Sequence, residues 1–255
     1  MNYTILLPVD FSAHGPRMEE VAKIFSHLAD KRFSAFFLRD YGTQGSLHSP
    51  AAEVEKLYMK LALQSEATSL NLELKFLNDQ NGLLALANQS RFADLLLLDP
   101  LNEVGTISLG ELPVDFFEKM HCPLLLANDM THEYEEIIFL FDYDLKGLAA
   151  LKSFHALFGE VSHRKKFTLV TVCPDDEPGI FFEKSLVSYL QGVFENVGIH
   201  PMSRINLTEN LVSFVSTAKK PLLIMGQSAL ALLENKTLAD RLMKNETSVY
   251  YSNSG

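Results

Sequence analysis

Residues 3–15, YTILLPVDFSAHG, and residues 135–147, EEIIFLFDYDLKG, follow one pattern at an offset of about 132 residues (135 − 3). The matched positions share residue type: Ile5 with Ile137, Asp10 with Asp142, Phe11 with Tyr143, and Gly15 with Gly147. Later segments match in the same order, ADLLLLD (93–99) with KPLLIMG (220–226) and CPLLLA (122–127) with TSVYYS (247–252). Ordered matches of this kind indicate an internal repeat.

Within each half, short apolar runs alternate with longer segments of helical period, which is typical of βαβ units and a mostly parallel sheet. The predicted strands are 4–9, 33–38, 70–76, 94–98 and 123–127 in the first half, and 137–141, 166–172, 199–205, 221–225 and 247–251 in the second. Helices are predicted at 16–30, 51–67 and 82–90, and between the strands of the second half. The sequence thus predicts an α/β protein of two tandem domains, 1–130 and 135–255, with a short polar linker.

Composition and motifs exclude several classes of function. The net charge of −10, with acids and bases mixed, disfavours nucleic acid as a partner. The N-terminus has no secretory signal and no apolar stretch reaches the length of a membrane span, so we expect a cytoplasmic protein that does not enter the membrane. Cys122 and Cys173 form no C-x-x-C pair and are expected to be buried, and no metal-binding or catalytic motif is present. We therefore predict no metal site, no catalytic residue and no enzyme activity.

Two features resemble the universal stress protein family. The first strand ends in VDFS (9–12) before a helix, and Leu109-Gly110 precedes a helix that leads into the strand beginning Cys122-Pro123. The resemblance covers both halves. It implies a doubly wound, five-stranded parallel sheet of the adenine-nucleotide alpha-hydrolase-like kind in each half. In nucleotide-binding members of the family, ATP lies over the carboxyl ends of the first and fourth strands, where such sheets generally bind ligands.

Carried onto this chain, the resemblance implies candidate ligand-binding positions at Asp10, Phe141, Asp142, Val172, Met225, Gly226, Ala229, Ala239 and Asp240. The matching acid in ATP-binding relatives contacts the nucleoside end of the ligand, so Asp10 and Asp142 are candidates for that contact. An Asp at the end of a strand also commonly caps the following turn or helix. Both interpretations of the two acids stay open at this point.

The family's phosphate-binding motif, Gly-x2-Gly-x9-Gly-(Ser/Thr), is altered in both halves. Its glycines let main-chain N–H groups approach a phosphate. The second half keeps the spacing but reads Gly226, Ala229, Ala239 and then Asp240. The first half has Asp99-Pro100 at the opening position, a changed spacing, and Glu111 after Gly110.

An acid thus replaces the motif's final hydroxyl in both halves. A carboxylate about 4 Å from a phosphate costs about 1 kcal/mol per charge pair in water-like surroundings and several times more when desolvated. Mg²⁺ could bridge the carboxylate and the phosphate, but we regard such a bridge as disfavoured. Alternatively, Asp240 and Glu111 simply sit in the first turn of a closing helix, where the helix dipole favours acids.

These patterns lead to a main hypothesis and two alternatives. The main hypothesis is a non-catalytic, stress-associated protein that binds an unidentified protein partner or small ligand, with no cofactor. Its two domains would form an intramolecular pseudo-dimer, and further pairing into a homodimer stays open. The first alternative is an ATP-binding sensor with slow ATPase activity that uses Asp142, Met225 and Gly226 of the second domain. The second is a divergent protein that holds an unrelated ligand in one domain.

Overall fold

The computed structural model describes residues 2–9, 21, 23–28, 30–38, 59, 71–77, 82–98, 112–127, 134–173, 179–233 and 235–253. The chain divides into two compact units. Unit 1 holds Met1–Ile107 and Asp115–Thr131, and unit 2 holds Ser108–Val114 and His132–Gly255. The domain limits drawn from the sequence, 1–130 and 135–255, stay a prediction.

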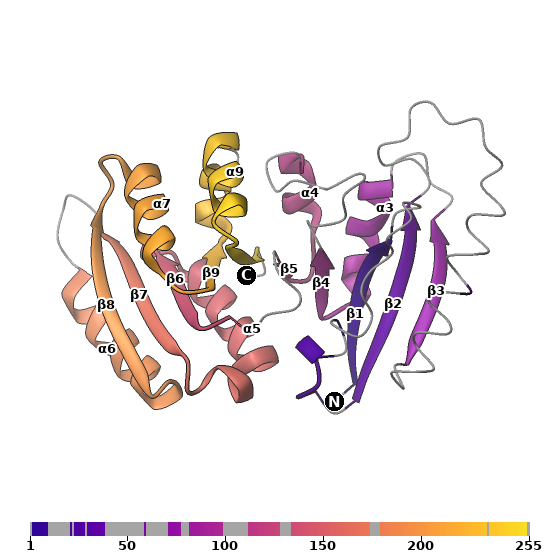
Figure 1. Cartoon of the computed structure of the whole chain (residues 1–255), viewed down its shortest axis with the longest axis horizontal. Coiled ribbons are helices and arrows are strands. Elements are labelled where there is room, and N and C mark those ends of the chain that lie inside the picture. The colour runs from indigo at the N-terminus through magenta and orange to yellow at the C-terminus, as the bar shows by residue number, and fades with distance from the viewer. Residues whose placement is uncertain are drawn as a thin grey trace. The chain divides into compact units, whose positions relative to one another are not determined.

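Unit 1 contains a parallel sheet of five described strands, shown from indigo to magenta in Figure 1. The strands are β1 (Asn2–Val9), β2 (Asp30–Leu38), β3 (Leu72–Leu77), β4 (Leu95–Leu98) and β5 (Leu124–Leu126). Their order is β3-β2-β1-β4-β5. Ile5 of β1 pairs with Phe33 on one side and Leu95 on the other, so the first strand lies between the second and the fourth.

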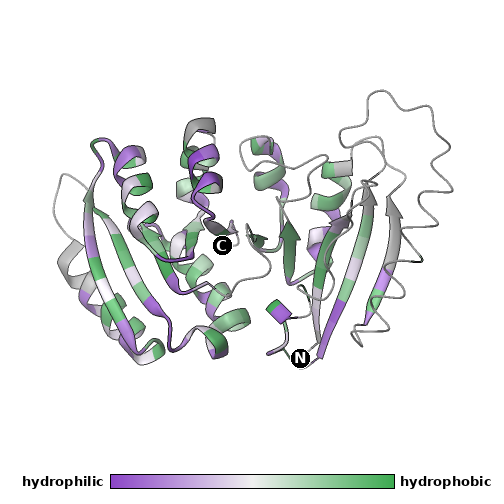
Figure 2. Cartoon of the chain, viewed as in Figure 1, coloured by the Kyte–Doolittle hydropathy of each residue, from purple (hydrophilic) through white to green (hydrophobic). Residues whose placement is uncertain are grey.

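Apolar residues explain why these segments form the interior of unit 1. All residues of β4 and β5 are buried, and both strands are apolar along their length (Figure 2).

The described helices of the first half are α3 (Gly82–Gln89), the short 3-10 helix η1 (Ser90–Phe92) and α4 (Val114–Lys119). Val21, Phe25 and Leu28, within the predicted helix 16–30, are buried, although β2 already begins at Asp30. The predicted helix 51–67 lies outside the described residues except for Met59.

Unit 2 repeats the strand order of unit 1. Its strands are β6 (Glu136–Phe141), β7 (Lys166–Cys173), β8 (Asn196–Ser203), β9 (Pro221–Gly226) and β10 (Ser248–Ser252). They are parallel and lie in the order β8-β7-β6-β9-β10, which matches β3-β2-β1-β4-β5 position by position. The predicted fold class, a doubly wound parallel sheet in each half, is therefore confirmed.

The helices of unit 2 cover both faces of its sheet. They are α5 (Leu145–Ser162), α6 (Gly179–Val193), α7 (Leu207–Thr217), the 3-10 helix η3 (Gln227–Ala229), α8 (Leu230–Leu233) and α9 (Lys236–Lys244). Helices α5 and α6 lie on one face, and α7 and α9 lie on the other (Figure 1). The connections that follow β6 and β9 therefore leave the sheet in opposite directions, which creates a topological switch point between these neighbouring strands. None of the described helices has the length and apolar character needed to cross a bilayer.

One strand begins and ends earlier than the sequence predicts. The expected strand 199–205 is observed as Asn196–Ser203. Pairing with β7 from Lys166 opposite Asn196 draws the earlier residues into the sheet. At the other end, the Ser203 hydroxyl accepts a hydrogen bond from the Ile205 N–H at 3.1 Å, and Asn206 adopts a left-handed conformation (φ 55). This local turn stops the strand and leads into α7.

An aromatic cluster fills the space between α5 and β10. Phe154 is fully buried, and its ring centroid lies 5.3 Å from the stacked ring of Phe158 and 5.3 Å from the perpendicular ring of Tyr250. The Tyr250 hydroxyl donates a hydrogen bond to Ser153 Oγ at 3.0 Å, so the phenol of this buried ring is satisfied. The cluster fixes α5 on the sheet.

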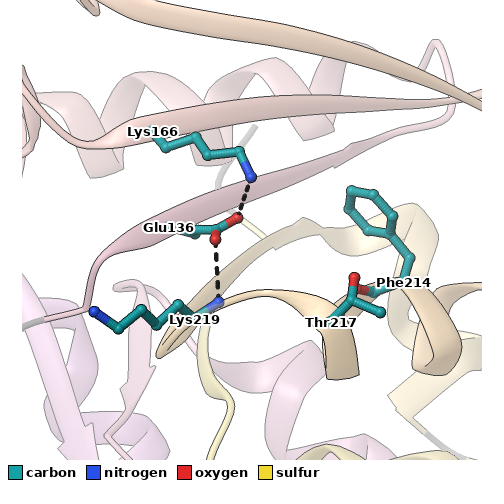
Figure 3. A network of polar contacts seen from close by, with 5 residues as sticks. All are labelled: Glu136, Lys166, Phe214, Thr217 and Lys219. Carbon is teal, nitrogen blue, oxygen red and sulfur yellow. Dashed lines mark hydrogen bonds and ion pairs between the residues drawn. The ribbon is translucent and has the colours of Figure 1, made fainter.

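A carboxylate ties together three segments at the start of β6. Glu136 accepts from Lys166 Nζ of β7 at 2.7 Å and from the backbone N–H of Lys219, before β9, at 3.1 Å (Figure 3). Thr217, at the end of α7, donates its hydroxyl proton to the Phe214 carbonyl at 2.8 Å (Figure 3). Because only 17% of the Glu136 side chain is exposed, this carboxylate is less screened by solvent than the surface ion pairs.

We expect Phe154→Ala to lower the free energy of unfolding by about 3–5 kcal/mol, because it leaves a cavity against two aromatic neighbours. Urea titration followed by circular dichroism measures this change. Phe92→Ala is the matched control, since Phe92 is 78% exposed, and it should change stability by less than about 0.5 kcal/mol. Equal effects of the two substitutions would contradict the described packing.

We expect Glu136→Ala to cost about 1 kcal/mol of unfolding free energy, since it removes one charge-assisted and one backbone hydrogen bond. The same titration measures it, together with a double-mutant cycle against Lys166→Met. Asp115→Ala breaks an exposed pair with Lys119 (3.4 Å) and should cost no more than about 0.5 kcal/mol. Additive effects of the Glu136 and Lys166 substitutions would show that the pair is not coupled.

Candidate functional site

The switch point of unit 2 brings several candidate residues to one edge of the sheet. Phe141 ends β6, Met225 and Gly226 end β9, and Val172 is the next-to-last residue of β7. Because all three strands are parallel, their carboxyl ends lie at the same edge. Sequence reasoning therefore placed these four positions in one region, and their role in binding stays a prediction.

Three of these four positions have side chains that lie in the protein core. Phe141 and Met225 have no exposed surface, and Val172 is 2% exposed. Side chains buried to this degree contact the interior of unit 2 and not solvent. A ligand at this edge would therefore meet the backbone of these positions and the side chains of the loops that follow them.

The loop after β6 is held by two aspartates. Asp142 Oδ1 accepts from the Asp144 N–H at 3.3 Å, and Asp144 Oδ1 accepts from the Lys146 N–H at 3.1 Å as the N-cap of α5. Tyr143 between them adopts a left-handed conformation (φ 66), and its ring lies 5.2 Å from that of Phe141. Asp142 thus makes the turn-capping contact that one of its two interpretations expects. Asp142 is half-buried, and its contact with a ligand stays a prediction.

Gly226, at the first glycine position of the predicted phosphate motif, has a packing role. A Cβ on Gly226 would lie 2.6 Å from the Gly147 Cα and 2.8 Å from the Gly147 nitrogen, which is closer than real Cβ atoms approach backbone. Residue 226 must therefore be glycine for β9 to pass the first turn of α5 at this distance. Next to this contact, Lys146 Nζ donates a hydrogen bond to the side-chain oxygen of Gln227. The Gly226 backbone and this side-chain pair join the two loops of the switch point.

The remaining motif positions lie in helices. Ala229 ends η3, and Ala239 is a fully buried residue inside α9. The Ala239 N–H donates to the Asn235 carbonyl at 3.0 Å, and Asn235 Oδ1 accepts from the Leu238 N–H at 3.2 Å. The main-chain donor at the motif's third glycine position is therefore occupied within the protein.

The placement of Asp240 corrects one expectation. Asp240 is half-buried and is the fifth residue of α9, so it lies beyond the first turn that the helix-dipole interpretation assigned to it. The reason is that α9 begins at Lys236, directly after the Asn235 cap, and not near Ala239. Helix α9 packs against α7 and α8.

The corresponding positions in the first half of the sequence lie outside the described residues. This applies to the candidate Asp10 and to the altered motif positions Asp99, Pro100, Gly110 and Glu111. The predictions for these residues therefore stay predictions.

The cysteines and histidines of the described regions give no support for other chemistry. Cys122 is buried as expected, and burial, followed by the nearby charge of Asp94, raises the pKa of its thiol to about 12. The neighbouring His121 is exposed and accepts a hydrogen bond from Arg91 Nε at 3.0 Å, so Cys122 and His121 form no pair of nucleophile and base.

Cys173 ends β7, and its side chain is not among those that the structure describes. Among the described residues, no group of three His, Cys, Asp or Glu side chains could hold a metal ion.

Sequence reasoning missed three residues that shape this edge: Asp144, Gln227 and Asn235. Asp144 and Asn235 each stand directly before a helix, which is a recognisable N-cap signal. Gln227 has no such signal, because its contact with Lys146 joins residues 81 positions apart.

We expect Gly226→Ala to lower the free energy of unfolding by about 1–3 kcal/mol, because the added methyl group would overlap the backbone of α5. Gly192→Ala is the matched control: it lies in α6 with no atom within 4 Å of the added Cβ, so it should raise stability by about 0.5–1 kcal/mol. Urea titration of the ligand-free protein measures both. An unchanged stability for Gly226→Ala would contradict the packing role.

No protein-family model and no curated protein matches the sequence of this chain. A universal stress protein from Archaeoglobus fulgidus DSM 4304 superposes with a TM-score of 0.66 at 12% identity, over 99% of this chain and 96% of that one. A protein from Pseudomonas aeruginosa UCBPP-PA14 that is assigned to the universal stress proteins gives a TM-score of 0.57 at 13% identity, over 98% and 92%. A protein of unknown function from Pseudomonas aeruginosa PAO1 gives 0.53 at 13% identity, over the same shares. Over nearly its whole length, the chain thus has the fold of the universal stress proteins.

Proposed function

We propose that this protein is a non-catalytic, stress-associated protein that acts by binding a small ligand or a protein partner, without the family's mode of polyphosphate binding in unit 2. The observation that carries this proposal is the hydrogen bonding of α9. The Ala239 N–H, at the motif's third glycine position, is donated to the Asn235 carbonyl, and the Asn235 side chain caps the start of the same helix. A phosphate would have to displace both contacts to gain these donors.

The acidic side chains also argue against the binding of a triphosphate. Asp142 and Asp144 lie in the loop after β6, and Asp240 lies at the position where the family has a hydroxyl. Each carboxylate within about 4 Å of a phosphate would cost about 1 kcal/mol in water-like surroundings. One cation, Lys146, lies in the first turn of α5, and its ammonium group donates a hydrogen bond to the side chain of Gln227. The edge therefore favours a neutral or cationic group over a triphosphate.

The association with stress rests on likeness of fold. It is part of the proposal because the chain superposes with a universal stress protein over 99% of its length. We further propose a cytoplasmic location and an intramolecular pseudo-dimer of the two domains, with pairing into a homodimer as an additional step.

A second candidate function is an ATP-binding sensor that uses unit 2, with slow ATPase activity. It is favoured by one observation: Asp142 follows the first strand of unit 2 directly, is half-buried, and stands at the switch-point edge with Met225 and Gly226. In this arrangement the carboxylate of Asp142 would accept a hydrogen bond from the nucleoside end of the ligand.

Isothermal titration of the full chain with ATP and Mg²⁺ separates the two candidates. The main proposal expects no binding in the micromolar range and no copurified nucleotide. A chain with 8 Tyr and no Trp makes retained nucleotide easy to see as a raised ratio of absorbance at 260 nm to that at 280 nm. Micromolar affinity that depends on unit 2 would overturn the main proposal. In that case Asp142→Ala should abolish binding while Asp115→Ala, a surface acid of α4, should not, and unchanged affinity of the Asp142 variant would contradict the sensor.

A motif-repair variant tests the part played by α9. We expect that combining Ala229→Gly, Ala239→Gly and Asp240→Ser yields no ATP binding, because the main-chain donor at position 239 stays within the helix. The glycine inside α9 should also cost about 1 kcal/mol of stability. Titration calorimetry and urea titration measure the two effects. A gain of micromolar ATP binding would show that the side chains alone, and not the helix, prevent it.

A further inference from the structure

No further inference is drawn: the strongest candidate, the apolar surface that Ile199 of the edge strand β8 and Ile205 of the β8–α7 turn expose on unit 2, carries nothing because no feature of the described residues shows what would cover it.

Discussion

The contact between Gly226 and Gly147 is the constraint on which the carboxyl edge of unit 2 depends. At this point the backbone of β9 passes the first turn of α5 so closely that a single methyl group would not fit. The contact fixes where both loops leave the sheet, and so where Asp142 and Gln227 lie. It also accounts for a glycine at position 226 without a bound phosphate.

Helix α9 bears on the proposal that unit 2 lacks the family's mode of phosphate binding. A phosphate loop works because its N–H groups have no partner inside the protein. Here the segment between Gly226 and Ala239 contains η3, α8 and the start of α9, and helical hydrogen bonds use such groups internally. The side chains of Ala239 and Asp240 and the helical backbone of α9 therefore support the same proposal, that unit 2 lacks the family's phosphate-binding mode.

Much of the fold could be predicted from the sequence because its strands are short, buried and apolar. LLLL in β4 and PLLIMG in β9 are almost pure core, and their matched places in the two halves revealed the repeat. The start of α9 could not be predicted in the same way, because the helix-dipole interpretation placed Asp240 in the first turn, whereas α9 begins at Lys236. The contact between Lys146 and Gln227 also escaped prediction, since only the pairing of β6 with β9 brings these distant residues together.

The strand order of unit 2 has a consequence for folding. Strand β6 pairs with β9, so Glu136 finds its partner Pro221 only 85 residues later (221 − 136). Long-range parallel pairing of this kind slows folding, because loop-closure entropy is lost before the contacts form. During synthesis, the apolar strand β6 would leave the ribosome well before β9 exists, with one of its edges unpaired. Unit 1 has the same arrangement, since Ile5 of β1 pairs with Leu95 of β4, 90 residues later (95 − 5), so chaperone assistance during translation would matter for both units.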